Sequence, residues 1–179
     1  MYRRYGKGPF YVQFFVRFPG YTDKESFVVE LPSLWELPHS VSTFLELVHS
    51  KLYDGTAFLA NTGGSKGILK IGGNPVEKES ARLERRYKQL GYEDSALYFT
   101  ETSPANYPCT NKYSVGFVGR GPGLEIYLSS ASGDNGDASE KTCFGRVVRG
   151  MKILNRLDSI TSKSNQAVDI VEVVYLAIE

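Results

Sequence analysis

The sequence contains little cysteine and little histidine, each occurring only twice in 179 residues. The two cysteines, Cys109 and Cys143, are too few to form a disulfide scaffold, and a chain of this length can bury a core without one. We expect reduced thiols, one of them buried, because free cysteine commonly behaves as a small core hydrophobe. A catalytic cysteine needs a nearby histidine, but His39 and His49 both lie on or beside one expected helix, which argues against a cysteine nucleophile.

Long apolar runs and an excess of charge are also absent from the sequence. No segment is long enough to span a bilayer and no signal-peptide core follows Met1, so we expect a soluble protein, cytoplasmic by default. The net charge of +1 does not favour nucleic acid or an anionic membrane as a partner. We expect residues 1–9 to form a flexible tail and residues 10–179 to form one monomeric domain.

Two glycine-rich stretches lack the remaining features of a phosphate-binding loop. Such a loop ends in Gly-Lys-Ser/Thr and leads into a helix, whereas residues 63–67 and 119–123 do neither. Residues 134–137 lack the alternating oxygen ligands and the final glutamate of a calcium loop. We therefore expect turns at these places, with no metal and no cofactor.

Aromatic and β-branched runs predict a mainly β protein. Residues 10–18 and 26–31 indicate two strands, paired as a hairpin across residues 21–25. Further strands are expected within residues 53–61 and at 68–71, 96–99, 113–118, 124–128, 144–148 and 167–178.

Three amphipathic stretches predict helices. The first, near residues 40–52, has Phe44 on its apolar face, and the second, near 150–160, includes Leu154. The third runs from about Pro75 to Leu90, with Gly91 as its left-handed stop and a charged face that we assign to solvent. Together with the strands, this predicts a closed, eight-stranded antiparallel barrel capped by the first two helices, with the third outside it.

Several motifs sit in a recognisable order on this framework. They are Tyr53-Asp54-Gly55-Thr56 followed by Phe58, then Gly72-Gly73-Asn74, and finally Phe144-Gly145 followed by Gly150-Met151. This order is similar to that of the cyclophilins, the barrel-fold peptidyl-prolyl cis-trans isomerases, from Phe10 to Ile178. The resemblance implies a groove that binds proline-containing peptides.

The resemblance also implies that the catalytic machinery is degenerate. Rotation about a peptide bond meets a barrier of about 18 to 20 kcal/mol, and a cation that donates to the twisted prolyl nitrogen stabilises the transition state. Cyclophilins use an arginine two residues after the phenylalanine that matches Phe58, and this position is Ala60. Their groove phenylalanine and glutamine fall on Ile68 and Ile71.

The remaining groove positions diverge as well. The family's Gln-Phe-Phe strand resembles residues 125–127, its Ala-Asn segment falls on 116–117, and its tryptophan loop falls near 134–141, where no tryptophan occurs. We expect Ile68, Leu69 and Tyr127 to line one concavity beside Ala60. Glu125 and Phe117 complete the expected peptide-binding set, and cyclosporin-type ligands are expected to bind poorly.

Three functions remain open at the level of sequence. The first is a catalytically degenerate domain that binds protein or an Xaa-Pro peptide. The second is a weak isomerase acting in protein folding, with Arg120 as the substitute donor. The third is a structural domain of a larger assembly, with the helix near 75–90 as its contact surface.

Overall fold

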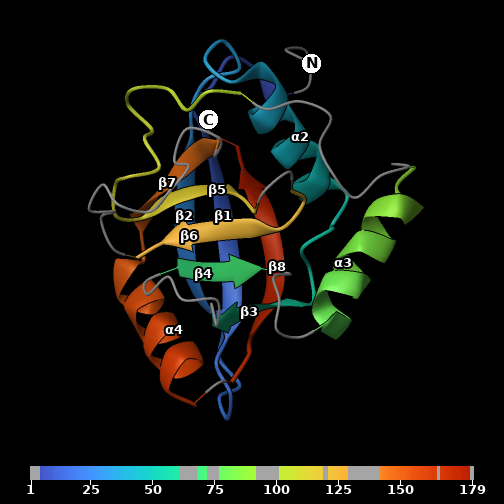
Figure 1. The fold of residues 1–179 in the computed structure, drawn as a ribbon, viewed down its shortest axis with the longest axis vertical. Coiled ribbons are helices and arrows are strands. Elements are labelled where there is room, and N and C mark those ends of the chain that lie inside the picture. The colour runs from blue at the N-terminus through green and yellow to red at the C-terminus, as the bar shows by residue number, and fades with distance from the viewer. Residues whose placement is uncertain are drawn as a thin grey trace.

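The protein is described here by a computed structural model that covers residues 5–60, 68–71, 77–91, 101–118, 121–128, 142–164 and 166–177. Its strands are β1 (Phe10–Arg17), β2 (Glu25–Leu31), β3 (Thr56–Ala60), β4 (Ile68–Ile71), β5 (Ser114–Phe117), β6 (Leu124–Tyr127), β7 (Cys143–Arg149) and β8 (Val168–Leu176). Its helices are α2 (Pro38–His49), α3 (Glu77–Gln89) and α4 (Met151–Ser164) (Figure 1). None of the described helices is long and apolar enough to cross a membrane.

The strands form one curled antiparallel sheet. Their order is β1-β2-β7-β5-β6-β4-β3-β8, and β8 pairs with both β3 and β1, so the pairing returns to its starting strand. The expected hairpin is present as β1 paired with β2. A mainly β, antiparallel fold with helices packed against it is thus confirmed, whereas the expected strand at 96–99 lies outside the described residues.

The core fills the inside of the curled sheet. Along β1, Phe10, Val12, Phe14 and Val16 are buried and alternate with half-buried residues, the period-2 pattern of a strand with one face on a core. The Phe14 ring stacks on that of Phe27 in β2, with 4.9 Å between the ring centroids. Burial of these aromatic rings supplies much of the apolar area that holds the sheet in its curled shape.

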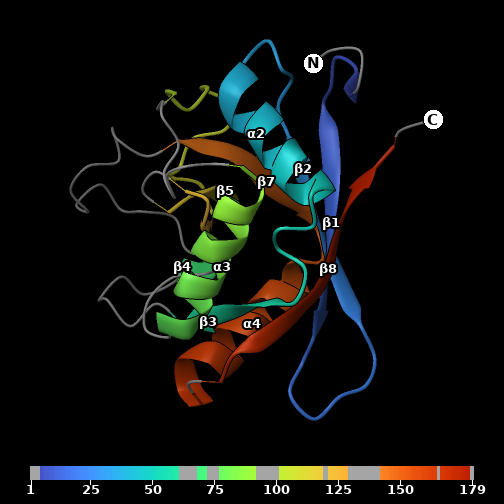
Figure 2. The same ribbon diagram turned by 90° about the vertical axis from the view of Figure 1, so that its right-hand side faces the viewer.

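Helices α2 and α4 lie at opposite ends of the sheet, and α3 lies beside it (Figure 2). The ring of Phe44 on α2 is 5.0 Å from that of Phe144 on β7, and both belong to the core. Leu154 on α4 is fully buried in the same core. The packing expected of Phe44 and Leu154 is therefore confirmed.

The start of α2 is capped from a distant part of the chain. The helix begins at Pro38, two residues before the expected start, and its N-cap residue Leu37 makes no side-chain cap. Instead the carboxylate of Glu101 accepts hydrogen bonds from the backbone N–H groups of His39 (3.0 Å) and Ser40 (2.6 Å). A carboxylate at this place satisfies unpaired N–H groups and complements the helix dipole.

Helix α3 ends as the sequence predicts. Gly91 follows it with φ +93°, the left-handed conformation that favours glycine. Leu83 and Tyr87 are buried, while Leu90 is exposed. The Arg86 guanidinium donates to the carbonyl oxygens of Leu52 and Asp54, which ties α3 to the turn before β3.

The cysteines form a disulfide, so the expectation of two reduced thiols was wrong. Cys109 and Cys143 are bonded, with 5.3 Å between their Cα atoms and a sequence separation of 34. Cys143 lies at the start of β7, and Cys109 lies in the segment 101–113, drawn in yellow-green in Figure 1. The sequence spacing carried no sign that the fold brings them together.

The amino-terminal segment also differs from the expected flexible tail from Tyr5 onward. The Tyr5 hydroxyl donates to the carboxylate of Glu46 on α2 at 2.9 Å, and its ring meets that of Tyr175 on β8 edge-on. This part of the segment is therefore anchored to two elements of the domain. Residues 1–4 lie outside the described residues.

Replacing Phe44 should test the packing of α2 on the sheet. We expect Phe44→Ala to lower the free energy of unfolding by about 3 to 5 kcal/mol, because it leaves a cavity against Phe144. Leu90→Ala, at an exposed position just after α3, is the control and should cost less than about 1 kcal/mol. Urea unfolding measures both, and equal losses would contradict the assigned packing.

Candidate functional site

The positions expected to form the groove meet on three neighbouring strands. In the register of β3 with β4, Ala60 is opposite Leu69. In the register of β4 with β6, Ile68 is opposite Tyr127 and position 70 is opposite Glu125. The predicted positions 60, 68, 125 and 127 therefore lie on three neighbouring strands, but position 60 shares the row of position 69 and Ile126, whereas position 68 shares the row of Tyr127.

The residues of β6 alternate between the two faces of the sheet. Leu124 and Ile126 belong to the main core, together with Leu128 just beyond the strand. Tyr127 belongs instead to a separate buried cluster with Cys109 and Cys143. Because side chains alternate along a strand, Glu125 and Tyr127 face outward from the core, and we call this surface the outer face.

The register divides the expected groove positions between two rows. Residues directly opposite in an antiparallel pair share a face, so position 68 belongs to the row of Tyr127, on the outer face. Positions 69 and 71 are opposite the core residues Ile126 and Leu124. Positions 68 and 69 therefore belong to opposite rows of the register.

Phe117 also differs from its expected role in binding peptide. Its ring lies 4.4 Å from that of Phe144, and it is part of the main core. The preceding residue, Gly116, is the one on the outer face, opposite Glu125. The Phe117 side chain thus contributes to packing rather than to a surface.

Tyr127 and Glu125 interact directly on the outer face. The Tyr127 hydroxyl donates a hydrogen bond to the Glu125 carboxylate at 2.9 Å, and both side chains are buried. Burial, followed by the interaction with Glu125, raises the pKa of Tyr127 well above its ordinary value of 10.0. Tyr127 is therefore a neutral phenol at physiological pH and can present an apolar ring.

The segment 101–113 supplies part of the cover over this face. Its Cys109 shares a buried cluster with Tyr127 and Cys143, and the backbone N–H of its Tyr113 donates to the carbonyl oxygen of Tyr127 at 2.5 Å. The exposed fraction of Tyr127 is only 7%, and that of Glu125 is 3%. The expected peptide-binding surface is thus a covered face rather than an open groove.

A further tyrosine holds the loop at the rim of this region. The fully buried Tyr53 donates from its hydroxyl to the carbonyl oxygen of Pro122 at 2.8 Å. Residues 121–123 lead directly into β6. The predicted substitute donor Arg120 precedes them and lies outside the described residues, as does the segment 134–141.

Sequence reasoning missed the polar residues that attach the segment 101–113 to the sheet. The Glu30 carboxylate accepts hydrogen bonds from Tyr107 (2.8 Å) and from Arg146 (2.7 Å). Burial alone would raise the pKa of Glu30, but these hydrogen bonds lower it overall. These contacts join residues that are far apart in the sequence, so no local pattern predicts them.

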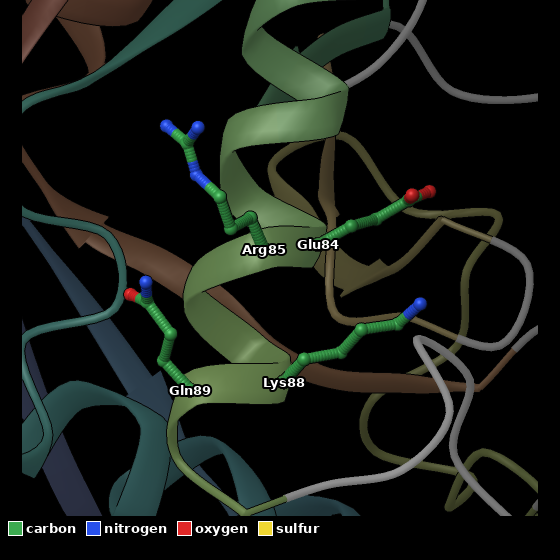
Figure 3. A pocket seen from close by; sticks show the side chains of 4 residues that line it. All are labelled: Glu84, Arg85, Lys88 and Gln89. Carbon is green, nitrogen blue, oxygen red and sulfur yellow. The ribbon is translucent and has the colours of Figure 1, made fainter.

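No group of three possible metal-ligating side chains occurs among the described residues. An open hollow elsewhere on the surface is lined, within the described part of the chain, by Glu84, Arg85, Lys88 and Gln89 of α3. Figure 3 shows Glu84 and Lys88 pointing to one side of the helix, and Arg85 and Gln89 to the other. These side chains diverge, so they do not form a convergent binding site.

The sheet, its capping helices and its outer face define a cyclophilin-like β domain. A family model described as cyclophilin type peptidyl-prolyl cis-trans isomerase/CLD matches residues 15–175. The chain therefore belongs to the cyclophilin-type peptidyl-prolyl cis-trans isomerase family.

A solved structure agrees with this family at the level of the fold. The protein is similar to the Mimivirus cyclophilin in its crystal structure, with a TM-score of 0.64 and 14% sequence identity, over 95% of this chain and 91% of that chain. No curated protein matches the chain by sequence. Identity this low shows a common fold and leaves activity to be argued from the residues.

The pair of Tyr127 and Glu125 predicts a pH-dependent effect of Tyr127→Phe. The variant loses one hydrogen bond, which should lower the free energy of unfolding by about 1 to 3 kcal/mol at neutral pH. The raised pKa of Tyr127 contributes stability that is fully present below pH 10.0 and is lost as the pH rises through the folded-state pKa. As the pH rises from about 8 to about 11, the free energy of unfolding should therefore fall less in Tyr127→Phe than in the natural protein.

Urea unfolding over this pH range measures the difference. Tyr21→Phe, at an exposed position, is the control and should follow the natural protein. Parallel pH profiles for all three proteins would show that Tyr127 is not held as a neutral phenol.

Proposed function

We propose that this protein is a cyclophilin-like domain that binds protein or extended, proline-containing segments with little or no isomerase turnover. The family membership supports a role in recognising such segments. The proposed lack of turnover is supported by the alanine at position 60, which matches the position of the family's catalytic arginine.

The loss of this arginine bears on the rate because of the chemistry of the bond. During isomerisation the prolyl amide loses its resonance, and its nitrogen becomes a hydrogen-bond acceptor only near the transition state. A cation placed at that nitrogen lowers the barrier without tightening ground-state binding. Alanine cannot donate, so a domain that keeps the apolar surface can bind without accelerating rotation.

The apolar surface that we assign to binding consists of Tyr127 with position 68 beside it. These two positions are opposite each other on β6 and β4. An aromatic ring held as a neutral phenol suits a proline ring, which offers only apolar edges. The aliphatic Ile68 replaces the family's phenylalanine at the neighbouring position, so contact area is reduced rather than abolished.

The burial of the outer face favours a second candidate, a structural domain of a larger assembly. Tyr127 and Glu125 are almost entirely covered, so a peptide reaches them only if the cover moves. If it never moves, an exposed surface such as α3, with Arg85 and Lys88 on it, would be the contact surface. A weak isomerase that uses Arg120 is the third possibility, and the same assay distinguishes all three.

The test is a measurement of cis/trans exchange in an Xaa-Pro peptide by NMR. We expect the natural protein to be near background, because loss of one electrostatic donor typically costs about a hundred- to a thousandfold in rate. Ala60→Arg should raise the rate only modestly, since the family's glutamine is also replaced, by Ile71, and residues of one site act together. Thr22→Arg adds the same charge at an exposed turn and should change nothing.

Each other outcome selects one of the alternatives. A rate typical of cyclophilins in the natural protein would refute the proposal, and its loss in Arg120→Ala would identify the substitute donor. Absence of peptide-induced shifts at Tyr127 under both oxidising and reducing conditions would favour the structural domain. Peptide-induced shifts without turnover are the result that we expect.

A further inference from the structure

The segment 101–113 lies over the outer face and is held there by the disulfide. Cys143 is opposite Gly116 in the register of β7 with β5, and Gly116 is opposite Glu125 in the register of β5 with β6. The disulfide therefore stands in the same row as the Tyr127–Glu125 pair. Both cysteines belong to one buried cluster with Tyr127.

The sheet is shaped to receive this disulfide. A Cβ atom at Gly116 would lie 2.7 Å from the carbonyl oxygen of Thr142 and 3.2 Å from the sulfur of Cys143. Any larger residue at this position would collide with the β7 backbone and crowd the sulfur. Glycine at position 116 thus leaves room for the disulfide on the outer face.

The two ends of the segment are attached independently of the disulfide. At one end Glu101 caps α2, Tyr107 donates to Glu30, and the Ser103 hydroxyl oxygen accepts from the backbone N–H of Cys143 at 2.8 Å. At the other end Tyr113 donates from its N–H to Tyr127 and accepts at its carbonyl oxygen from the N–H of Val147 at 2.9 Å. These contacts would keep the segment near the sheet when the disulfide is absent.

The turn at residues 108–112 is attached by the disulfide and by hydrogen bonds from Ser114 to Pro108 (2.7 Å) and Asn111 (3.2 Å). Thr110, Asn111 and Lys112 are exposed, and the backbone hydrogen bond from Asn111 to Pro108 is local to the turn. Between residues 108 and 112, Cys109 is the buried side chain. Its bond to Cys143 is therefore the covalent constraint on this turn, beside the hydrogen bonds that Ser114 donates to Pro108 and Asn111.

We propose that the Cys109–Cys143 disulfide is a redox-controlled latch over the outer face. While it is intact, the turn at residues 108–112 covers Tyr127. Its reduction by a dithiol frees this turn, exposes Tyr127 and opens the face to a proline-containing segment. This inference specifies the regulation of the site in the proposed function and depends on that function only for the identity of the ligand.

The reaction is an ordinary thiol–disulfide exchange. One thiolate of the dithiol attacks the sulfur of Cys109, which is 8% exposed whereas Cys143 is fully buried. The sulfur–sulfur bond breaks, Cys143 leaves as a thiolate and takes up a proton, and the second thiol of the reductant then releases Cys109. The protein gains two electrons and two protons, and the dithiol becomes a disulfide.

Solvent exposure of tyrosine rings tests the latch without relying on activity. In NMR spectra with a soluble paramagnetic probe, the Tyr127 ring signals should broaden in protein reduced with dithiothreitol and stay sharp in oxidised protein. Tyr53, which is fully buried in the core, is the internal control and should stay sharp in both states. Amide exchange of Tyr113, bonded to the Tyr127 carbonyl, should rise about tenfold on reduction.

The variant Cys109→Ala removes the latch permanently. It should show the broadened Tyr127 signals without reductant and should not respond to dithiothreitol. Equal shielding of Tyr127 in oxidised, reduced and Cys109→Ala protein would overturn the latch. Two free thiols in air-equilibrated protein, or broadening of Tyr53 together with Tyr127 on reduction, would overturn it as well.

Peptide binding then separates the latch from the proposed function. We expect an Xaa-Pro peptide to bind the reduced protein at least about tenfold more tightly than the oxidised protein. Exposure of Tyr127 on reduction without peptide binding would support the latch and refute the proposed ligand. Equal peptide binding in both states, with peptide-induced shifts at Tyr127 in each, would refute the latch and leave the proposed function standing.

Discussion

The pairing of β8 with both β1 and β3 is the constraint on which the rest of the structure depends. A register shift in β8 lets both Ile170 and Val173 reach the core, although they are three residues apart. The Asp54 carboxylate accepts a hydrogen bond from the N–H of Val173 at 2.9 Å, and the N–H of Gly55 donates to the carbonyl oxygen of Ile170 at 2.8 Å. The turn before β3 is thus fixed to β8, which in turn sets the position of Ala60.

Patterns within short stretches of sequence predicted the elements well, whereas contacts between distant stretches escaped prediction. The hairpin, the two capping helices and the stop at Gly91 each depend on residues close together in the chain. The disulfide and the Glu101 cap depend on where separate segments meet, which periodicity does not encode. Neighbouring positions of a strand fall on opposite faces, so the expected groove positions fall in different rows: position 69 is opposite the core residue Ile126, and Phe117 itself belongs to the core.

The core and the outer face of the sheet contribute differently to this fold. The residues that shape the sheet, such as Phe58 and Phe144, are buried and contribute to stability wherever the chain is used. The outer face carries a second buried cluster, in which the disulfide attaches the segment 101–113 next to Tyr127.

The cap on α2 has a consequence for the order in which the protein can form. Glu101 follows His39 by 62 positions, so a ribosome releases the helix long before it releases the carboxylate that completes the helix. Until then the first turn of α2 carries N–H groups with no cap from Leu37, and the emerging helix lacks a stabilising contact. The cap of α2 can therefore form only after residue 101 has been synthesised. Long-range contacts of this kind are typical of β-rich domains.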